Sequence, residues 1–242
     1  MKVLVTRPRE DAAALVAALT ARGHEVMLEP LLTIVPRGAV DWPAGHEAAQ
    51  ALLVTSANGA RAFAGLDQRR GLPVFAVGDA SATAARDLGF GNVISATGDV
   101  AALAALVTAR LDPADGPLLH PAAGLLAGDL QAALSAAGFT LLRAVLYDAI
   151  PAEALSGACT RALNDGLIDV VTFFSPRTAA SFASLLASAD LSQACRGVTA
   201  LCLSKAVAAR ISELSWRRIA VAAQPDQAAL LVQLDALEAG GV

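Results

Sequence analysis

The sequence contains few aromatic residues and few cysteines, and each shortage limits what the protein can be. Phe, Trp and Tyr make up 4% of the 242 residues, so a core must be built mainly from Ala, Val and Leu. The three cysteines, Cys159, Cys195 and Cys202, lack the spacing of a metal site or a redox motif. An odd number of cysteines suits a reducing compartment, so we interpret them as small buried hydrophobic residues.

Long apolar runs and basic clusters are also absent. No apolar run reaches the length of a membrane span, and the one at the N-terminus is too short for a signal peptide. The formal net charge is -4 and Lys and Arg do not cluster, which argues against a general nucleic-acid binder. We therefore expect a soluble, cytoplasmic protein that binds neither membranes nor nucleic acid.

The signatures of common cofactors are missing as well. No G-x-G-x-x-G motif follows a predicted strand and no P-loop pattern occurs, which argues against a nucleotide cofactor. The histidines His24, His46 and His120 lie in unrelated contexts, without carboxylates at metal-ligand spacing. His120 ends a predicted strand, where it would either reach a cleft or serve the structure. We expect neither a cofactor nor a metal ion.

What the sequence does contain is a regular alternation of β-rich runs and alanine-rich segments with helical spacing. This alternation predicts an α/β protein with parallel sheets. The predicted strands lie at residues 3–6, 25–29, 51–56, 74–77, 92–96, 117–120, 140–147, 170–175, 199–204 and 219–223.

The chain also contains an internal repeat. Residues 6–36 align with residues 121–151, and the alignment places Gly23 opposite Gly138 and Pro36 opposite Pro151. Between and after them, two further segments align in the same way, 52–63 with 171–182 and 76–86 with 200–210. We call residues 6–36 A, the segments within 52–86 B, residues 121–151 A′ and the segments within 171–210 B′. The order A, B, A′, B′ predicts two similar α/β domains. The residues alone leave open whether A packs with B or with B′.

Five polar turns are predicted to end a strand and begin a helix. Ser175 has the position of an N-cap and Pro176 that of a first helical residue. In α/β sheets ligands bind at the carboxyl ends of the strands, where helix N-termini offer N–H donors and partial positive charge. One such turn alone can be a simple cap, but the set predicts a ligand with several anionic groups. The turns are "TSANG" (55–59), "VGDAS" (77–81), "HPAAG" (120–124), "FSPRT" (174–178) and "CLSKA" (202–206).

Tyr147 is the only tyrosine and lies in "VLYDAIP", beside the junction of A′ and B′. It is either a packed ring with a solvated hydroxyl or a phenol that faces an interdomain cleft and protonates a leaving group. Arg7, Arg61 and Arg177 lie at strand ends or early in the following helix. They are either carboxylate partners or solvated side chains.

The segments "VLVTRP", "VTSANGARAF", "AVGDASATAARDLG", "LLRAVLYDAIP" and "VTFFSPRTAASF", in this order and spacing, resemble the uroporphyrinogen-III synthase family over almost the whole chain. The resemblance implies two doubly wound, flavodoxin- or Rossmann-like α/β domains joined by a two-segment extended linker. Domain 1 would comprise residues 1–30 and 152–242 and domain 2 residues 37–145, with 31–36 and 146–151 as crossing linkers. A would then pack with B′, and B with A′.

The resemblance also implies a function. The family acts on hydroxymethylbilane, a linear tetrapyrrole with eight carboxylates, which it dehydrates and cyclises to uroporphyrinogen III with inversion of the terminal ring. Such a polyanion is the kind of ligand that the five turns predict. The enzyme would be a monomer without a cofactor. A non-catalytic two-domain binding or sensor module for a polyanionic ligand is the first alternative. A nucleotide-dependent oxidoreductase or transferase is the second, and the missing glycine motif counts against it.

The resemblance assigns roles to individual residues. Tyr147 would assist departure of the substrate hydroxyl. "CLSKA" departs from the family pattern, so Ser204 or Lys205 would replace an expected hydroxyl, and Gly124 in "HPAAG" would act only as a backbone donor. The residues expected to bind substrate are Arg7, Ser56, Ala57, Asn58, Gly78, Ser81, Gly124, Ser175, Pro176, Arg177, Ser204 and Lys205.

Overall fold

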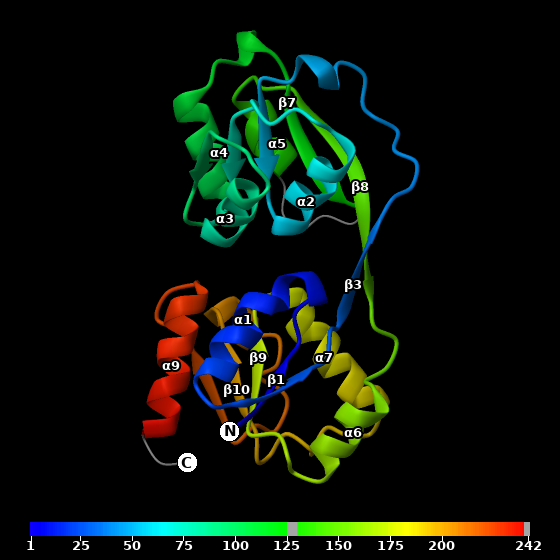
Figure 1. Cartoon of the computed structure of the whole chain (residues 1–242), viewed down its shortest axis with the longest axis vertical. Helices are drawn as coiled ribbons and strands as arrows, with labels where there is room; N and C mark the ends of the chain where they lie inside the picture. Colours follow the sequence, from blue (N-terminus) through cyan, green and yellow to red (C-terminus); the bar gives the residue numbers. More distant parts are fainter. Residues whose placement is uncertain (125–129, 240–242) are drawn as a thin grey trace. The chain divides into compact units, whose positions relative to one another are not determined.

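The computed structural model describes residues 1–124 and 130–239 of the chain (Figure 1). The chain divides into two compact units. Unit 1 comprises Met1–Thr33 and Ile150–Val242, and unit 2 comprises Ile34–Ala149. Unit 1 is therefore discontinuous in sequence, and the chain passes from one unit to the other twice. Each unit is α/β and is built around its own largely parallel sheet, so the predicted fold class is confirmed.

The sheet of unit 1 has five parallel strands in the order β11-β10-β9-β1-β2. The chain leaves β1 toward β2 on one side and returns on the other with β9, so the topological switch point lies between β1 and β9. Strands of the first repeat segment and of the last thus share one sheet. The strands are β1 (Lys2–Val5), β2 (Glu25–Leu28), β9 (Val170–Phe173), β10 (Thr199–Cys202) and β11 (Arg218–Val221).

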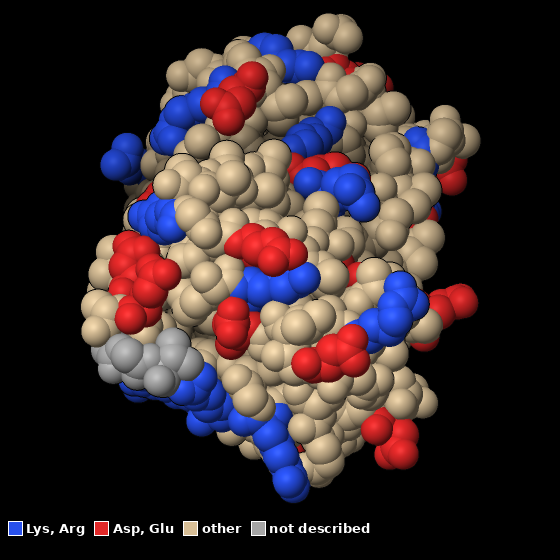
Figure 2. Space-filling view, turned by 60° about the horizontal axis from the view of Figure 1, so that its bottom comes forward, with Lys and Arg blue, Asp and Glu red and all other residues tan. Residues whose placement is uncertain are grey.

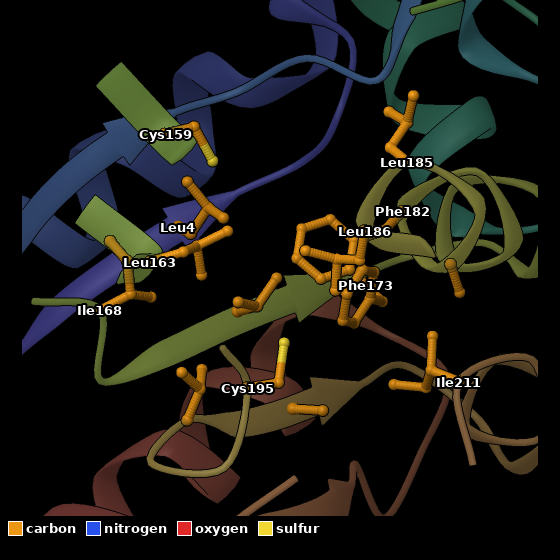
Figure 3. Packing of buried hydrophobic residues seen from close by; sticks show 14 of the residues in the cluster. Leu4, Cys159, Leu163, Ile168, Phe173, Phe182, Leu185, Leu186, Cys195 and Ile211 are labelled. Atoms are coloured by element: carbon orange, nitrogen blue, oxygen red, sulfur yellow. The ribbon is translucent and has the colours of Figure 1, made fainter. Parts of the chain in front are cut away.

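Helices cover both faces of this sheet because consecutive strand residues point to opposite sides. In β1, Val3 and Val5 pack with α1 and α9, whereas Leu4 packs with α6 and α7. Figure 3 shows the cluster that contains Leu4, in which the ring centroids of Phe173 and Phe182 lie 5.3 Å apart in an edge-to-face arrangement. The helices are α1 (Arg9–Ala21), α6 (Gly157–Asn164), α7 (Pro176–Ser188), α8 (Lys205–Ala208) and α9 (Gln227–Ala239).

All three cysteines belong to unit 1, and all are buried and free. Burial raises the pKa of each thiol to about 12. Figure 3 shows Cys159 and Cys195 among aliphatic side chains. The interpretation of the cysteines as small hydrophobic residues is confirmed.

The sheet of unit 2 has six strands in the order β3-β8-β7-β4-β5-β6, and the neighbours from β8 to β6 run parallel. Its switch point lies between β4 and β7. The strands are β3 (Leu32–Pro36), β4 (Ala51–Val54), β5 (Val74–Ala76), β6 (Val93–Ser95), β7 (Leu118–Ala123) and β8 (Leu141–Pro151). The helices are α2 (Ala57–Leu66), α3 (Asp79–Asp87), α4 (Val100–Arg110) and α5 (Leu130–Ala136), with 3₁₀ turns at His46–Ala48 and Pro113–Asp115.

The predicted elements differ from the observed ones in two places. The turn expected at 120–124 lies inside β7, which runs on to Ala123, so His120 does not end a strand. Beyond Leu119, β7 pairs only with β8, and a proline at 121 is tolerated where the β4 side is open. The segments expected as linkers are β3 and the end of β8, which pair with each other at the edge of the sheet.

Two further features of the described residues are the distribution of charge and the length and hydrophobicity of the helices. On the face shown in Figure 2, acidic and basic side chains are interspersed over most of the surface. None of the helices within residues 1–124 and 130–239 combines the length and hydrophobicity that crossing a membrane requires.

Candidate functional site

The end of β4 and the middle of β7 bring two polar side chains together at the switch point of unit 2. Thr55 follows β4 directly, and its Oγ1 lies 3.1 Å from Nε2 of His120 on β7. Burial, and to a lesser degree Arg143, lowers the pKa of His120 to about 4, so its ring is neutral at pH 7. His120 is therefore a neutral hydrogen-bonding partner inside the sheet rather than a cation that meets substrate.

Ser56 begins helix α2 and also contacts Tyr147. Its backbone is extended, and its Oγ accepts a hydrogen bond from the N–H of Gly59 at 3.2 Å, which is the geometry of an N-cap. The same oxygen lies 2.8 Å from the hydroxyl of Tyr147. Either hydroxyl can be the donor in this contact, because a serine oxygen has two lone pairs and can accept from Tyr147 as well as from Gly59. Two residues that were predicted separately thus form one hydrogen-bonded pair.

A β-bulge places Tyr147 against Ser56. Ala122 on β7 is opposite Val145 on β8, but Ala123 is opposite Tyr147, so β8 contains one extra residue at Leu146. In a regular strand Leu146 and Tyr147 would point to opposite faces, whereas here both are buried in the same cluster, 0% and 6% exposed. The bulge therefore turns the tyrosine toward α2. Nothing in the sequence pattern of 141–151 indicates it.

Gly59 is a residue that the sequence analysis did not single out. It is the third residue of α2, and a Cβ there would lie 2.6 Å from the carbonyl oxygen of Pro121. The start of α2 approaches β7 this closely only because position 59 has no side chain. The glycine after "TSAN" was the available signal, and its role depends on the sheet order.

Ala57 and Asn58 occupy the first two positions of α2, where helical N–H groups have no acceptor within the helix itself. Ala57 is half-buried, and the Asn58 side chain accepts a hydrogen bond from Arg61 Nη1 at 2.7 Å. Arg61 thus orients Asn58 in the first turn.

The next helix, α3, is a weaker candidate. Gly78 is its N-cap and provides no capping side chain, and Ser81 is buried in its first turn. Asp79 in that turn places a negative charge where an anion was expected. The aspartate itself interacts with the helix dipole and repels a second carboxylate.

Gly124 does not have the role that was predicted for it. Its N–H donates to the carbonyl of Tyr147 at 3.2 Å, so this amide is engaged within the unit. A Cβ at position 124 would lie 2.7 Å from Oδ1 of Asp148, which pairs with Arg37 through two hydrogen bonds of 2.8 and 2.9 Å. Gly124 is a point of close packing next to Tyr147.

In unit 1, Arg7 follows β1 at the switch point. Its guanidinium lies over the ring of Phe174, 4.2 Å from the centroid, and its Nη1 donates to Gln227 at 3.3 Å. Beside it, Thr6 Oγ1 donates to the carbonyl of Thr172 at 2.7 Å, joining β1 to β9. Stacking and hydrogen bonding fix one cation at the carboxyl end of this sheet.

Ser175 begins α7 as predicted. Its Oγ accepts from the N–H of Thr178 at 3.1 Å, and it lies 2.8 Å from the Thr178 hydroxyl. Pro176 is the first helical residue, which confirms its predicted position, but it has no N–H to offer a substrate. Arg177 follows it and lines a cavity of about 370 Å³ along α7, together with Pro151, Ala152, Ala180, Ser181, Ser184 and Leu185.

The last predicted turn begins a very short helix. Ser204 caps α8 through the N–H of Val207 at 3.4 Å, and Lys205 is its first residue. Helix α8 contains only four residues, so its summed dipole is small. Of Ser204 and Lys205, the charged Lys205 is therefore the stronger candidate partner for an anion. Among the described residues, no group of three or more His, Cys, Asp or Glu side chains is arranged to hold a metal ion.

Two parallel sheets, each with helices that begin at the carboxyl ends of its strands, place the chain in the class of doubly wound α/β proteins. A family model described as uroporphyrinogen-III synthase HemD matches residues 13–232. The chain belongs to the uroporphyrinogen-III synthase family, whose members are cyclising lyases of tetrapyrrole biosynthesis.

Solved structures show the same fold. The uroporphyrinogen-III synthetase of Helicobacter pylori 26695 is 14% identical, with a TM-score of 0.66 over 98% of this chain and 99% of that one. A mutant uroporphyrinogen III synthase of the extremely thermophilic bacterium Thermus thermophilus is 18% identical, with a TM-score of 0.52 over 99% and 98%. A comparison with curated proteins returned no match.

Proposed function

We propose that this chain acts on hydroxymethylbilane and that the hydrogen-bonded pair of Tyr147 and Ser56 serves its dehydration. The observation that carries the proposal is the 2.8 Å contact between Ser56 Oγ and the Tyr147 hydroxyl, at the N-terminus of α2 beside the switch point of unit 2. Family membership supports the reaction class. The hydrogen-bonded pair supports the assignment of Tyr147 and Ser56 to the dehydration step.

Helix N-termini and fixed cations would hold the substrate carboxylates. In unit 2 the candidate residues lie at the start of α2, and in unit 1 they are Ser175 at the start of α7 and the cations Arg7, Arg177 and Lys205, which follow strand ends. A net charge of -4 does not prevent this, because carboxylates respond to the local field of a helix terminus. Gly78 and Ser81 would contribute less, because Asp79 lies next to them.

The first chemical step is loss of the substrate hydroxyl. Tyr147 donates its proton to that oxygen, the carbon–oxygen bond breaks, and water departs. The adjacent pyrrole nitrogen supplies the electron pair that stabilises the resulting cation, and Tyr147 is left as a phenolate. In this proposal the Ser56 hydroxyl acts as the donor in its 2.8 Å contact with Tyr147, so it stabilises the negative charge that develops on the tyrosine oxygen as the phenol proton leaves.

The outcome of ring closure then depends on which carbon of the terminal pyrrole is held closer to the cation. The terminal pyrrole attacks through its substituted carbon, and the spiro intermediate fragments and recloses with that ring inverted. The final ring proton returns to the Tyr147 phenolate, so the net change is loss of one water. Holding the substituted carbon nearer than the unsubstituted one is the main task of the protein, and such positioning is worth roughly 7–11 kcal/mol in favourable cases.

The remaining expectations are also part of this proposal. We propose that the two compact units are the domains of the enzyme and that it acts as a cytoplasmic monomer. The buried, free thiols of Cys159, Cys195 and Cys202 support a reducing compartment. Sedimentation velocity over a range of protein concentrations tests the monomer, and a larger species would contradict it.

Product analysis tests the function. Hydroxymethylbilane is generated enzymatically and incubated with the purified protein, and the oxidised products are separated by isomer. The proposal predicts type III uroporphyrin at a rate above that of spontaneous closure. Type I product alone, together with saturable binding of the bilane, would instead identify a binding module.

A further inference from the structure

Arg143 on β8 holds the end of β7 in place. Its Nη2 donates to two consecutive carbonyls, those of Ala123 and Gly124, each at 2.6 Å. Charge-assisted hydrogen bonds from one guanidinium nitrogen to two neighbouring carbonyls fix the orientation of the Ala123–Gly124 peptide. Arg143 is also the register partner of His120, so its side chain begins on the face of the sheet that carries His120.

The peptide that Arg143 holds is bonded directly to Tyr147. The N–H of Gly124 donates to the Tyr147 carbonyl at 3.2 Å, and the N–H of Arg37 donates to the carbonyl of Leu146 at 2.9 Å. These two hydrogen bonds hold the extra residue of the bulge and the residue that follows it. Arg143 thus reaches Tyr147 through one peptide, without touching the phenol.

The geometry around this peptide leaves little freedom. A Cβ at position 124 would lie 2.7 Å from Oδ1 of Asp148, whose half-exposed carboxylate is held in place by two hydrogen bonds from Arg37. Arg143 Nε is buried and has no hydrogen-bond acceptor among the residues that the structure describes. The hydrogen bonds of this guanidinium that the structure shows are therefore the two from Nη2 to the carbonyls of Ala123 and Gly124.

We infer that Arg143 is a positioning residue for the reaction: it fixes the Ala123–Gly124 peptide, which holds the β8 bulge that directs the Tyr147 hydroxyl to Ser56. This inference rests on the proposed function, in which Tyr147 is the proton donor. It predicts that loss of the Arg143 guanidinium displaces a phenol with which it makes no direct contact.

The chain offers a direct probe of this displacement, because Tyr147 is its only tyrosine. Protein labelled with ¹³C at the tyrosine Cζ gives a single resonance, whose position reports the environment of the hydroxyl independently of activity. The spectrum and the steady-state constants kcat and KM are measured for wild type, Arg143→Met and Arg143→Lys. Each variant is also made with Tyr147→Phe for the kinetic comparison.

Arg86→Met is the matched control. Arg86 is also in unit 2 and also donates through Nη2 to a backbone carbonyl, that of Val93 at 3.1 Å, but it belongs to α3. We expect its variant to leave both the tyrosine resonance and kcat at the wild-type values. Arg143→Met should shift the resonance and lower kcat by about 10- to 100-fold, as a displacement near 1 Å does, with KM changed by less than about threefold.

The double variants separate positioning from general damage. With Tyr147→Phe already present, Arg143→Met should lower kcat little further, because both changes remove the same contribution. Arg143→Lys keeps one charged donor and should show an intermediate shift and loss, which keeps the test valid should Arg143→Met not fold. An unchanged resonance with unchanged kcat in Arg143→Lys and Arg143→Met would overturn the inference, as would equal losses in both backgrounds. Equal turnover by wild type and Tyr147→Phe would overturn the role of Tyr147 and this inference with it.

Discussion

At the scale of single residues, the functional assignment depends on a pair that is 91 positions apart in sequence. Tyr147 stood out because it is the only tyrosine, and Ser56 stood out as a helix cap after a strand. Their hydrogen bond could not be predicted, because it requires the order of β4, β7 and β8 and a bulge at Leu146. Gly124 was assigned wrongly as a donor for the same reason, since its partner, the Tyr147 carbonyl, lies on another strand.

Replacing Tyr147 by Phe removes the proton donor and keeps the packed ring. We expect kcat to fall by about 100-fold, at the low end of what a general acid contributes, because the pyrrole itself stabilises the cation. KM should change little, since the phenol binds the leaving group only as it departs. Steady-state kinetics on hydroxymethylbilane measure both constants, and an unchanged kcat would remove the tyrosine from the mechanism.

Ser56→Ala should affect stability and activity together. Loss of the N-cap of α2 is expected to lower the free energy of unfolding by about 1 kcal/mol, and loss of the hydrogen bond to Tyr147 should lower kcat. Asp99→Ala is the matched control, because Asp99 caps α4 in the same unit through Ala101 and Ala102. It should cost similar stability in urea unfolding and leave kcat unchanged. Equal kcat values for the two variants would contradict the role of Ser56.

His120 gives the fold an acid-sensitive residue. Its pKa is about 4 in the folded chain, below the ordinary 6.5, so the unfolded chain binds the proton more readily between these values. Stability is therefore present above pH 6.5 and is lost as the pH falls toward 4, by up to about 3 kcal/mol. His120→Asn should flatten this part of the curve of unfolding free energy against pH. A wild-type curve that is flat from pH 6.5 to 4 would contradict the buried neutral ring.

At the scale of elements, local chemistry predicted helix starts well and strand ends less well. Ser175 was predicted as an N-cap, because an N-cap needs only a side chain that bonds three residues ahead, and Ser56 and Ser204 cap two of the other helices that the polar turns predicted. The end of β7 was misjudged, because "HPAAG" looks like a turn and its extension depends on pairing with β8. The sequence also did not predict that α8 would be only four residues long, because "KAVAAR" has good helical propensity.

The approach of α2 to β7 can be tested with two glycines of the same helix. Gly59→Ala would place a Cβ 2.6 Å from the Pro121 carbonyl, so α2 must move away from β7 and take Ser56 with it. We expect a loss of about 1–3 kcal/mol in unfolding free energy and a lower kcat. Gly65→Ala meets no atom within 4 Å and should raise stability by up to about 1 kcal/mol with kcat unchanged. Equal effects of the two substitutions would contradict the close packing.

At the scale of the whole molecule, the repeat predicted two α/β halves, but the residues alone did not say which segments pair. The observed sheets join β1 and β2 with β9, β10 and β11, and β4 and β5 with β7 and β8. This exchange was implied by the family resemblance and is a matter of topology that composition and periodicity cannot reveal. It sets two switch points, one in each unit, and both have a capped helix at the strand end.

The isomer composition of the product tests the central claim most directly. Wild type and Tyr147→Phe are each given the same enzymatically generated hydroxymethylbilane, and types I and III are quantified over time against a reaction without protein. The account predicts that wild type gives type III faster than spontaneous closure, and that Tyr147→Phe gives type III more slowly. Type I at the spontaneous rate from the wild-type protein would contradict it.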